Sequence, residues 1–221
     1  MNGCRIQLSR CTPIASGNNR DVFAHPQDPD LLIKTVKPEA WARRSVPGTF
    51  GPKRWFRRYK QYLPFLRECQ EHIASHLDGD LLPGFVQTLV GFVETDRGLG
   101  LVYRAERNRS GAYAQTLAKL IAAGLFDEEA RRALDTCLQS FLASNVIITG
   151  LDTNNLVYAY SEERGAHFVI IDGYGEKNLI PFNSISTWCN RRNKRKRIMS
   201  LRHAVAQAIR RREDTCRAGS G

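Results

Sequence analysis

The chain has 221 residues and a formal net charge of +11, and 42% of its residues are hydrophobic while 25% are charged. This composition is that of a globular protein with enough residues to bury a core in one domain or in two small lobes. No apolar run approaches the roughly 20 residues needed to span a bilayer, and the first five residues lack the apolar stretch of a signal peptide. We therefore expect a cytoplasmic protein with no transmembrane segment. Six scattered cysteines without a CxxC pair argue against a zinc site and a disulfide framework.

The first hundred residues predict an antiparallel meander. Strands are expected over residues 6–13, 21–24 and 31–36, with turns at 14–19 and 25–30 between them. Lys34 lies inside the third of these strands. A loop is expected at 46–52. Residues 85–94 and 99–105 predict a hairpin.

A helix is expected between these strands, over about residues 55–77. Tyr62, Phe65, Cys69 and Ile73 follow the three-and-four spacing of one buried face. Pro64 fits poorly inside a helix but well at its first turn, so a start near Pro64 is the alternative.

After residues 107–111 the sequence becomes helical in character. Asp127 is expected to be the N-cap of an amphipathic helix that runs to Leu142. Residues 151–158 and 168–175 then resemble two short strands, and a strongly basic segment follows at 191–197. We expect an α+β protein with two lobes: residues 1–106 with an antiparallel sheet and one helix, and residues 107–221, small, helical and ending in a basic tail.

Both late strands bring a polar residue into a turn, namely Asn155 and Asp172. Amide and carboxylate oxygens are ligands that Mg²⁺ accepts, and an amide followed one hairpin later by a carboxylate is how kinase-like folds hold the metal against ATP. Lys34 would then contact the phosphates, and Glu68 is the expected helix partner that holds its ammonium, with Glu71 as the second candidate.

The first turn offers a further phosphate contact. Ser16 and Gly17 are expected to cover the phosphates with backbone N–H groups. One glycine is far fewer than a full glycine-rich loop carries. Two histidines four residues apart, His72 and His76, have a zinc-like spacing without a third ligand, and we do not expect a metal there.

The chain resembles the YrbL-type PhoP regulatory network family, small bacterial proteins of the protein-kinase-like superfamily. The resemblance extends over about residues 5–205 and is carried by short segments: 24–26 with 33–34, 155–157, 171–176, 179–181 and 187–189 with the basic tail. It implies a kinase-like fold and nucleotide roles for Lys34, Glu68, Asn155 and Asp172. On such a fold adenine is expected against Val102 and Tyr103. The resemblance supplies no substrate.

One departure concerns catalysis. In active kinases the catalytic base lies five residues before the metal-binding asparagine, and here that place holds Gly150. Asp152 is a displaced base, an extra metal ligand or a turn residue. Gly173 follows Asp172 directly, so the usual aromatic residue between aspartate and glycine is missing. A regulated protein kinase is therefore not expected.

The first interpretation is a protein that binds ATP with magnesium and has weak or atypical phosphotransferase activity. The basic surface favours an anionic acceptor, and lipopolysaccharide core sugars fit that description. The alternative is a pseudokinase that acts through protein contacts in a bacterial stress response. A nucleic-acid-binding role for the basic cluster at 191–197 is the least favoured, because no DNA-binding motif is present.

Overall fold

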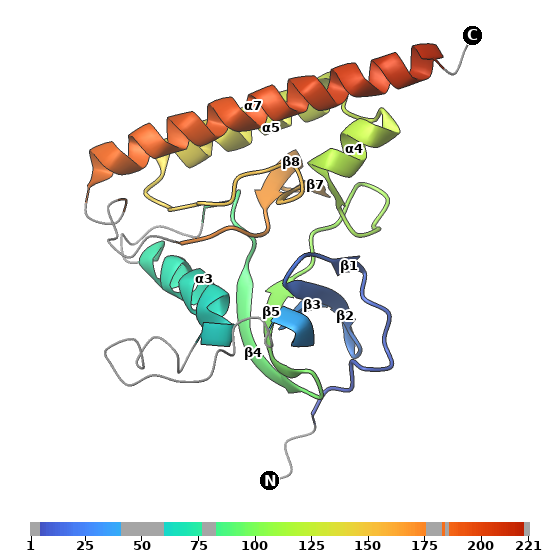
Figure 1. Cartoon of the computed structure of the whole chain (residues 1–221), viewed down its shortest axis with the longest axis vertical. Coiled ribbons are helices and arrows are strands. Elements are labelled where there is room, and N and C mark those ends of the chain that lie inside the picture. The colour runs from blue at the N-terminus through green and yellow to red at the C-terminus, as the bar shows by residue number, and fades with distance from the viewer. Residues whose placement is uncertain (1–4, 41–59, 77–82, 176–182, 184–185, 219–221) are drawn as a thin grey trace. The chain divides into compact units, whose positions relative to one another are not determined.

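The computed structural model describes residues 5–40, 60–76, 83–175, 183 and 186–218 (Figure 1). They belong to two compact units, Met1–Cys69 with Thr88–Ala105, and Gln70–Gln87 with Glu106–Gly221. The chain passes for the last time from the first unit to the second after Ala105, one residue before the division predicted at 106/107. Residues 70–87, which were predicted with the first lobe, pack with the second unit, since Val86 forms a bridge with Ile170 and the Gln87 N–H donates to the Tyr174 hydroxyl. The loop expected at 46–52 lies outside the described residues.

The first unit contains a five-stranded antiparallel sheet in the order β1-β2-β3-β5-β4. Its strands are β1 (Ala15–Ser16), β2 (Arg20–His25), β3 (Asp28–Val36), β4 (Leu89–Thr95) and β5 (Gly98–Arg104). Buried apolar side chains occupy both faces, with Phe23, Ile33 and Val102 in one cluster and Val36, Phe65 and Leu101 in another.

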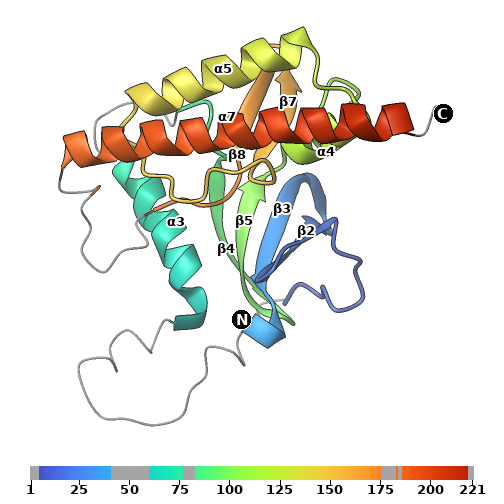
Figure 2. The ribbon, with the colours of Figure 1, turned by 45° about the horizontal axis from the view of Figure 1, so that its top comes forward.

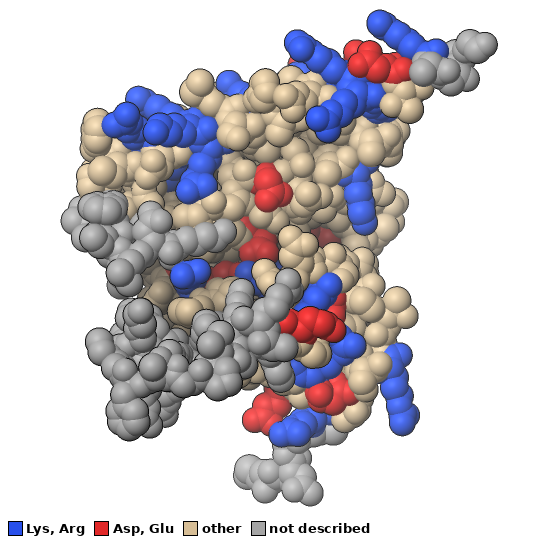
Figure 3. All heavy atoms as spheres, viewed as in Figure 1, with Lys and Arg blue, Asp and Glu red and all other residues tan. Residues whose placement is uncertain are grey.

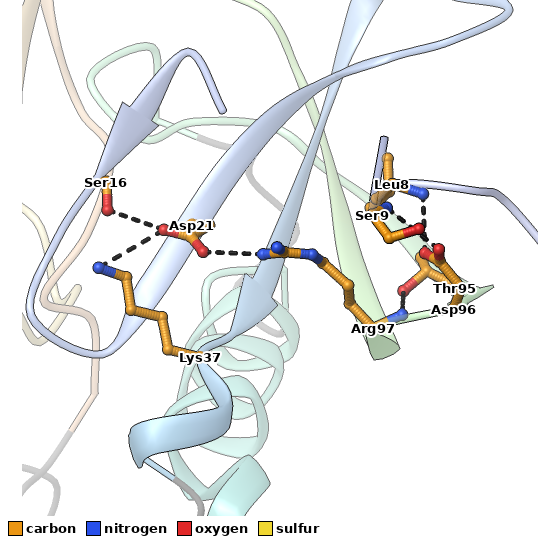
Figure 4. A network of polar contacts seen from close by, with 8 residues as sticks. All are labelled: Leu8, Ser9, Ser16, Asp21, Lys37, Thr95, Asp96 and Arg97. Atoms are coloured by element: carbon orange, nitrogen blue, oxygen red, sulfur yellow. Dashed lines mark hydrogen bonds and ion pairs between the residues drawn. The ribbon is translucent and has the colours of Figure 1, made fainter. Parts of the chain in front are cut away.

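The strand predicted over residues 6–13 is wrong. In this range Ile6 forms an isolated bridge with Thr95, but the N–H groups of Leu8 and Ser9 bond to a side chain instead of a neighbouring strand. The Asp96 carboxylate accepts the N–H groups of Leu8 at 2.7 Å and Ser9 at 3.0 Å, as Figure 4 shows. A side chain thus takes the bonds that a neighbouring strand would have taken.

The predicted helix is present in the region between β3 and β4. A 3-10 turn at Lys60–Tyr62 leads into α3 (Leu63–Ala74), so the described helix begins beside Pro64, as the alternative start required. Residues 55–59 lie outside the described part. Phe65 and Glu68 are its buried residues.

The second unit combines a small sheet with helices. Its strands are β6 (Gln115–Thr116), β7 (Leu156–Ser161) and β8 (Gly165–Ile170), in the order β6-β7-β8. Its helices are α4 (Leu117–Ala123), α5 (Glu128–Ala143) and α7 (Thr187–Ala218), and Figure 2 shows α7 alongside α5. The predicted N-cap is confirmed, because the Asp127 side chain accepts the N–H of Ala130 at 2.8 Å. Buried residues of α5 and α7, among them Leu138, Phe141 and Leu201, share one core.

The expected α+β class, with an antiparallel sheet in the N-terminal part and a helical C-terminal part, is confirmed. In the described part of the chain, no helix combines the length and apolar character needed to cross a membrane.

Candidate functional site

The two predicted metal ligands lie at the same end of one hairpin. In the β7–β8 register Leu156 pairs with Ile170, and beyond that pair the N–H of Ile171 donates to the carbonyl of Asn155 at 2.9 Å. Asn155 therefore directly precedes β7, and Asp172 follows β8 by two residues. The structure therefore places both residues at the same end of the β7–β8 hairpin in the second unit.

The carboxamide of Asn155 is held in one orientation. Its Nδ2 donates to the carbonyl of Gly150 at 2.7 Å and to Oδ2 of Asp152 at 3.1 Å. A carboxamide nitrogen carries two N–H bonds, so both have acceptors and the oxygen is the group that remains to act as a ligand. An amide oxygen next to a carboxylate suits Mg²⁺, which usually takes one or two protein ligands and completes its shell with phosphates and water.

Asp152, the speculative base, forms the turn that presents Asn155. Its side chain is exposed, and Oδ1 accepts the N–H groups of Asn154 at 2.8 Å and of Asn155 at 3.2 Å. This is an Asx turn, in which a short carboxylate bonds the backbone two and three residues ahead. Of the three roles considered for Asp152, the geometry favours the turn residue.

Gly150 and Gly173 approach each other backbone to backbone, which the sequence did not predict. Gly173 has φ +88°, and a Cβ atom there would lie 2.6 Å from the Cα of Gly150. Its carbonyl accepts the N–H groups of Thr149 at 2.7 Å and Gly150 at 3.1 Å. Asp172 Oδ1 accepts the N–H of Gly173 at 2.5 Å. Hydrogen bonds thus join the segment before Asn155 to the turn after Asp172. In the sequence, the glycine that directly follows Asp172 is the feature that could have indicated this contact.

Helix α7 fixes the same loop from its other side. The guanidinium of Arg197 donates to the carbonyl of Thr149, and the Thr149 hydroxyl donates to the carbonyl of Gly175 at 3.0 Å. The sequence predicts Arg197 only as part of a basic tail, whereas in the structure it is half-buried and supports the loop.

In the first unit Lys34 and Glu68 are both buried, at 4% and 3% exposure. The ammonium of Lys34 lies 3.8 Å from the centre of the Tyr103 ring, and the Tyr103 hydroxyl donates to Oε2 of Glu68. Arg20 donates to the other oxygen, Oε1. Tyr103 thus contacts both predicted residues, since its ring faces the lysine and its hydroxyl holds the glutamate.

Glu71, the second candidate partner of Lys34, has its bond in the second unit. Its Oε1 accepts the N–H of Ile147 at 2.6 Å. Glu68 belongs to the same unit as Lys34, and Glu71 belongs to the other unit.

The predicted phosphate-covering turn bonds within its own hairpin. The Gly17 N–H donates to the carbonyl of Arg20 at 2.9 Å, and the Ser16 hydroxyl donates to Asp21 at 2.8 Å. Asp21 also pairs with Arg97 at 3.0 Å and Lys37 at 3.5 Å (Figure 4). The described contacts of Ser16 and Gly17 therefore stabilise the hairpin.

The side chains of Val102 and Tyr103 belong to the core of the first unit. Val102 is 7% exposed and packs with Phe23 and Ile33, and Tyr103 is 1% exposed. Contact between this segment of β5 and a base would therefore come mainly from its backbone.

No cluster of three or more His, Cys, Asp or Glu residues able to hold a metal occurs within the described ranges. The rings of His72 and His76 lie 4.7 Å apart. Burial and the neighbouring His76 lower the pKa of His72.

A groove of about 870 Å³ lies within the second unit and has no counterpart among the sequence motifs. Phe85, His167 and Phe168 line it, together with residues of α5 that include Arg132. The Nε2 atom of His167 is buried and has no hydrogen-bond partner among the described residues. Burial lowers the pKa of His167.

A family model described as "PhoP regulatory network protein YrbL" matches residues 6–206. The chain is 30% identical over 188 residues to the protein named "Uncharacterized protein YrbL" of Escherichia coli (strain K12), and the match covers 83% of this chain and 80% of that relative. The protein of the same name from Shigella flexneri matches to the same extent.

Among solved structures, the chain is similar to the crystal structure of Rad53 1-466 in complex with AMP-PNP, with a TM-score of 0.46 and 14% sequence identity. The match covers 74% of this chain and 37% of the Rad53 chain, so this chain spans little more than a third of that protein.

Proposed function

The chain belongs to the family of PhoP regulatory network proteins of the YrbL type, and from this premise and the geometry of its two units we propose that it binds ATP with magnesium. Asn155 and Asp172 would supply the oxygen ligands of the metal. Lys34 would contact the phosphates, with Glu68 as its positioning partner.

The observation that carries this proposal is the end of the β7–β8 hairpin. An amide and a carboxylate lie there on paired strand ends, and both N–H bonds of the Asn155 amide have acceptors, which leaves its oxygen for a cation. The order of elements adds support. A lysine on the third strand, a glutamate on the next helix, and then the amide and the carboxylate follow each other as in protein kinases.

The proposed activity is a weak or atypical phosphoryl transfer to an anionic acceptor. Phosphoryl transfer depends mostly on positioning and on electrostatic stabilisation, so it does not strictly require a side chain at the position of Gly150. The bound magnesium would neutralise the phosphate charge. The chain's net charge of +11 favours acceptors that carry negative charge.

A pseudokinase is the second candidate, and Gly150 is the observation that favours it. This residue acts through its backbone, since its N–H donates to Gly173 and its carbonyl accepts from Asn155. Asp152, the nearby carboxylate, is bonded to the turn. Under this proposal the chain binds nucleotide, and its output is a contact with another protein.

Nucleotide binding is tested by the thermal stability of the purified full chain with and without ATP and magnesium. A ligand at about 100 times its dissociation constant stabilises the folded state by about 2.7 kcal/mol. We expect a magnesium-dependent rise in Tm that Lys34→Ala and Asp172→Asn abolish. Lys119→Ala, which removes an exposed lysine of α4, should keep the full rise. No rise for the wild type at millimolar nucleotide would refute the proposal.

Turnover separates the two candidates once binding is established. Phosphate release from ATP is measured with Asp172→Asn as the blank. Release that Asp172→Asn abolishes supports the enzyme. Binding without release above this blank supports the pseudokinase.

A further inference from the structure

Most of the net charge of the chain lies on one helix. Helix α7 contains eleven Lys or Arg residues and two acidic residues, a net formal charge of +9 out of the +11 of the whole chain. In Figure 3 these basic side chains appear in blue along the helix, mainly towards its two ends. Charge of one sign on a single element attracts polyanions and anionic surfaces.

The inward face of α7 is fixed in the second unit. Ile198, Leu201 and Val205 are buried in its core, and the ammonium of Lys194 donates to the carbonyls of Phe141 at 2.8 Å and Ser144 at 2.6 Å. The helix is therefore ordered by its own unit and does not have to fold when it meets a partner.

The outward face follows a three-and-four spacing and is exposed along its length. Its members, all exposed, are Trp188, Arg192, Arg195, Met199, His203, Ala206 and Arg210. This row runs over about 33 Å, from the 1.5 Å rise per residue of an α-helix.

The cations on and beside the start of this face have no partner of opposite charge among the described residues. Arg191, Arg192, Arg195 and Lys196 have no carboxylate within 4.0 Å in the part of the chain that the structure describes, whereas Arg202 pairs with Asp135. The charge of these four side chains therefore remains available to an external anion.

Two large apolar side chains lie among these cations. Trp188 is 66% exposed and Met199 is 71% exposed, and they lie three helical turns apart on the same face. The guanidinium of Arg192 lies 5.5 Å from the centre of the Trp188 ring. Trp188 and Met199 therefore add exposed apolar surface to a basic face.

We propose that the outward face of α7 docks on the surface of a bilayer that contains anionic lipids. The arginines and lysines would meet the phosphate groups, and Trp188 and Met199 would enter the boundary between headgroups and acyl chains. Helices that expose both Lys or Arg and large apolar side chains can lie in the plane of this boundary, and tryptophan favours that depth. A straight row of about 33 Å fits a flat surface. A nucleic acid would supply phosphate groups for the basic side chains but no apolar layer for Trp188 and Met199.

The test is sedimentation of the full chain with lipid vesicles. We expect binding to vesicles of phosphatidylglycerol mixed with phosphatidylcholine, no binding to pure phosphatidylcholine, and weaker binding as salt rises. Arg192→Gln combined with Arg195→Gln should weaken binding about 25-fold, since each cation near an anionic membrane contributes about fivefold. Trp188→Ser combined with Met199→Ser should also weaken it, with the salt dependence unchanged.

The matched control is Arg131→Gln combined with Arg132→Gln, which removes two exposed arginines from α5 and the same net charge. It should bind vesicles nearly as well as the wild type. Equal losses for the two arginine pairs would mean that net charge alone attracts the chain, and the docking face would be refuted. Tighter binding to duplex DNA than to the mixed vesicles, unaffected by the change of Trp188 and Met199, would instead assign the face to nucleic acid. This inference does not depend on nucleotide binding.

Discussion

Replacement of Lys194 by methionine is the most informative perturbation of the second unit. Lys194 is 1% exposed, and its ammonium donates to the carbonyls of Phe141 and Ser144 and to the Ser144 hydroxyl at 3.3 Å. These acceptors lie at the C-terminal end of α5, where the helix dipole and carbonyls without partners in the helix offset part of the cost of burying a cation. Methionine keeps most of the apolar stem and removes the charge.

The magnitude follows from the pKa of this lysine. Burial is the largest cause that lowers it from 10.5 to about 8, while Glu71 acts in the opposite direction. Between about pH 8 and pH 10.5 the unfolded chain holds a proton that the folded chain has lost, so the free energy of unfolding rises with pH over this window. The gain contributed by Lys194 between pH 7 and pH 9 is about 1 kcal/mol.

Urea denaturation of the wild type and of Lys194→Met at pH 7 and at pH 9 measures this gain. The difference in unfolding free energy between the two proteins should shift by about 1 kcal/mol in favour of the wild type as pH rises. Other groups that titrate in this range, including Cys137, whose pKa burial raises to about 12, are present in both proteins and cancel. A difference that stays constant between the two pH values would refute the assignment of a lowered pKa to Lys194.

Three further changes test the loops and the first unit. Gly173→Ala should destabilise the chain by about 3 kcal/mol, because it combines a positive φ with a Cβ 2.6 Å from Gly150, whereas Gly111→Ala, at φ +80° with open space around it, should cost about 1 kcal/mol in the same urea titration. Equal costs would contradict the close approach. Asp152→Ala should cost about 1 kcal/mol and Asp152→Asn much less, since asparagine also forms this turn; a large loss in phosphate release for Asp152→Asn would show that the carboxylate acts in catalysis. Asp21→Asn should cost about 1–3 kcal/mol by chemical denaturation, because the 8%-exposed carboxylate accepts from several donors, and an unchanged midpoint would show that these contacts do not stabilise the sheet.

The elements with a strong local pattern were predictable from sequence. The helix that Asp127 caps has its cap and its apolar stripe within a few residues of each other. The predicted segments 151–158 and 168–175 share with β7 and β8 only the apolar residues 156–158 and 168–170. The predicted metal ligands follow from these strands, because residues at paired strand ends must be neighbours. The prediction of a strand at 6–13 is wrong because the N–H group of Leu8 bonds to the carboxylate of Asp96, almost ninety residues away in the sequence.

The site residues that depend on distant contacts were not predictable. Gly150 looked like a missing base, and its backbone contact with Gly173 is visible only once the two loops are side by side. The basic tail gave a similar result. The positive charge of this segment is evident from the sequence. The local sequence does not show that Lys194 and Arg197 face inward to backbone carbonyls, whereas Arg192 and Arg195 face solvent.

The chain passes between its two units three times, after Cys69, after Gln87 and after Ala105. No single cut therefore yields either unit as one continuous polypeptide. The first crossing falls inside α3, so a protease that cleaves there would break a helix that supplies Phe65 to one core and the Glu71 carboxylate to the other unit. Any attempt to express the two units separately would need a rearranged gene that joins distant stretches of the chain.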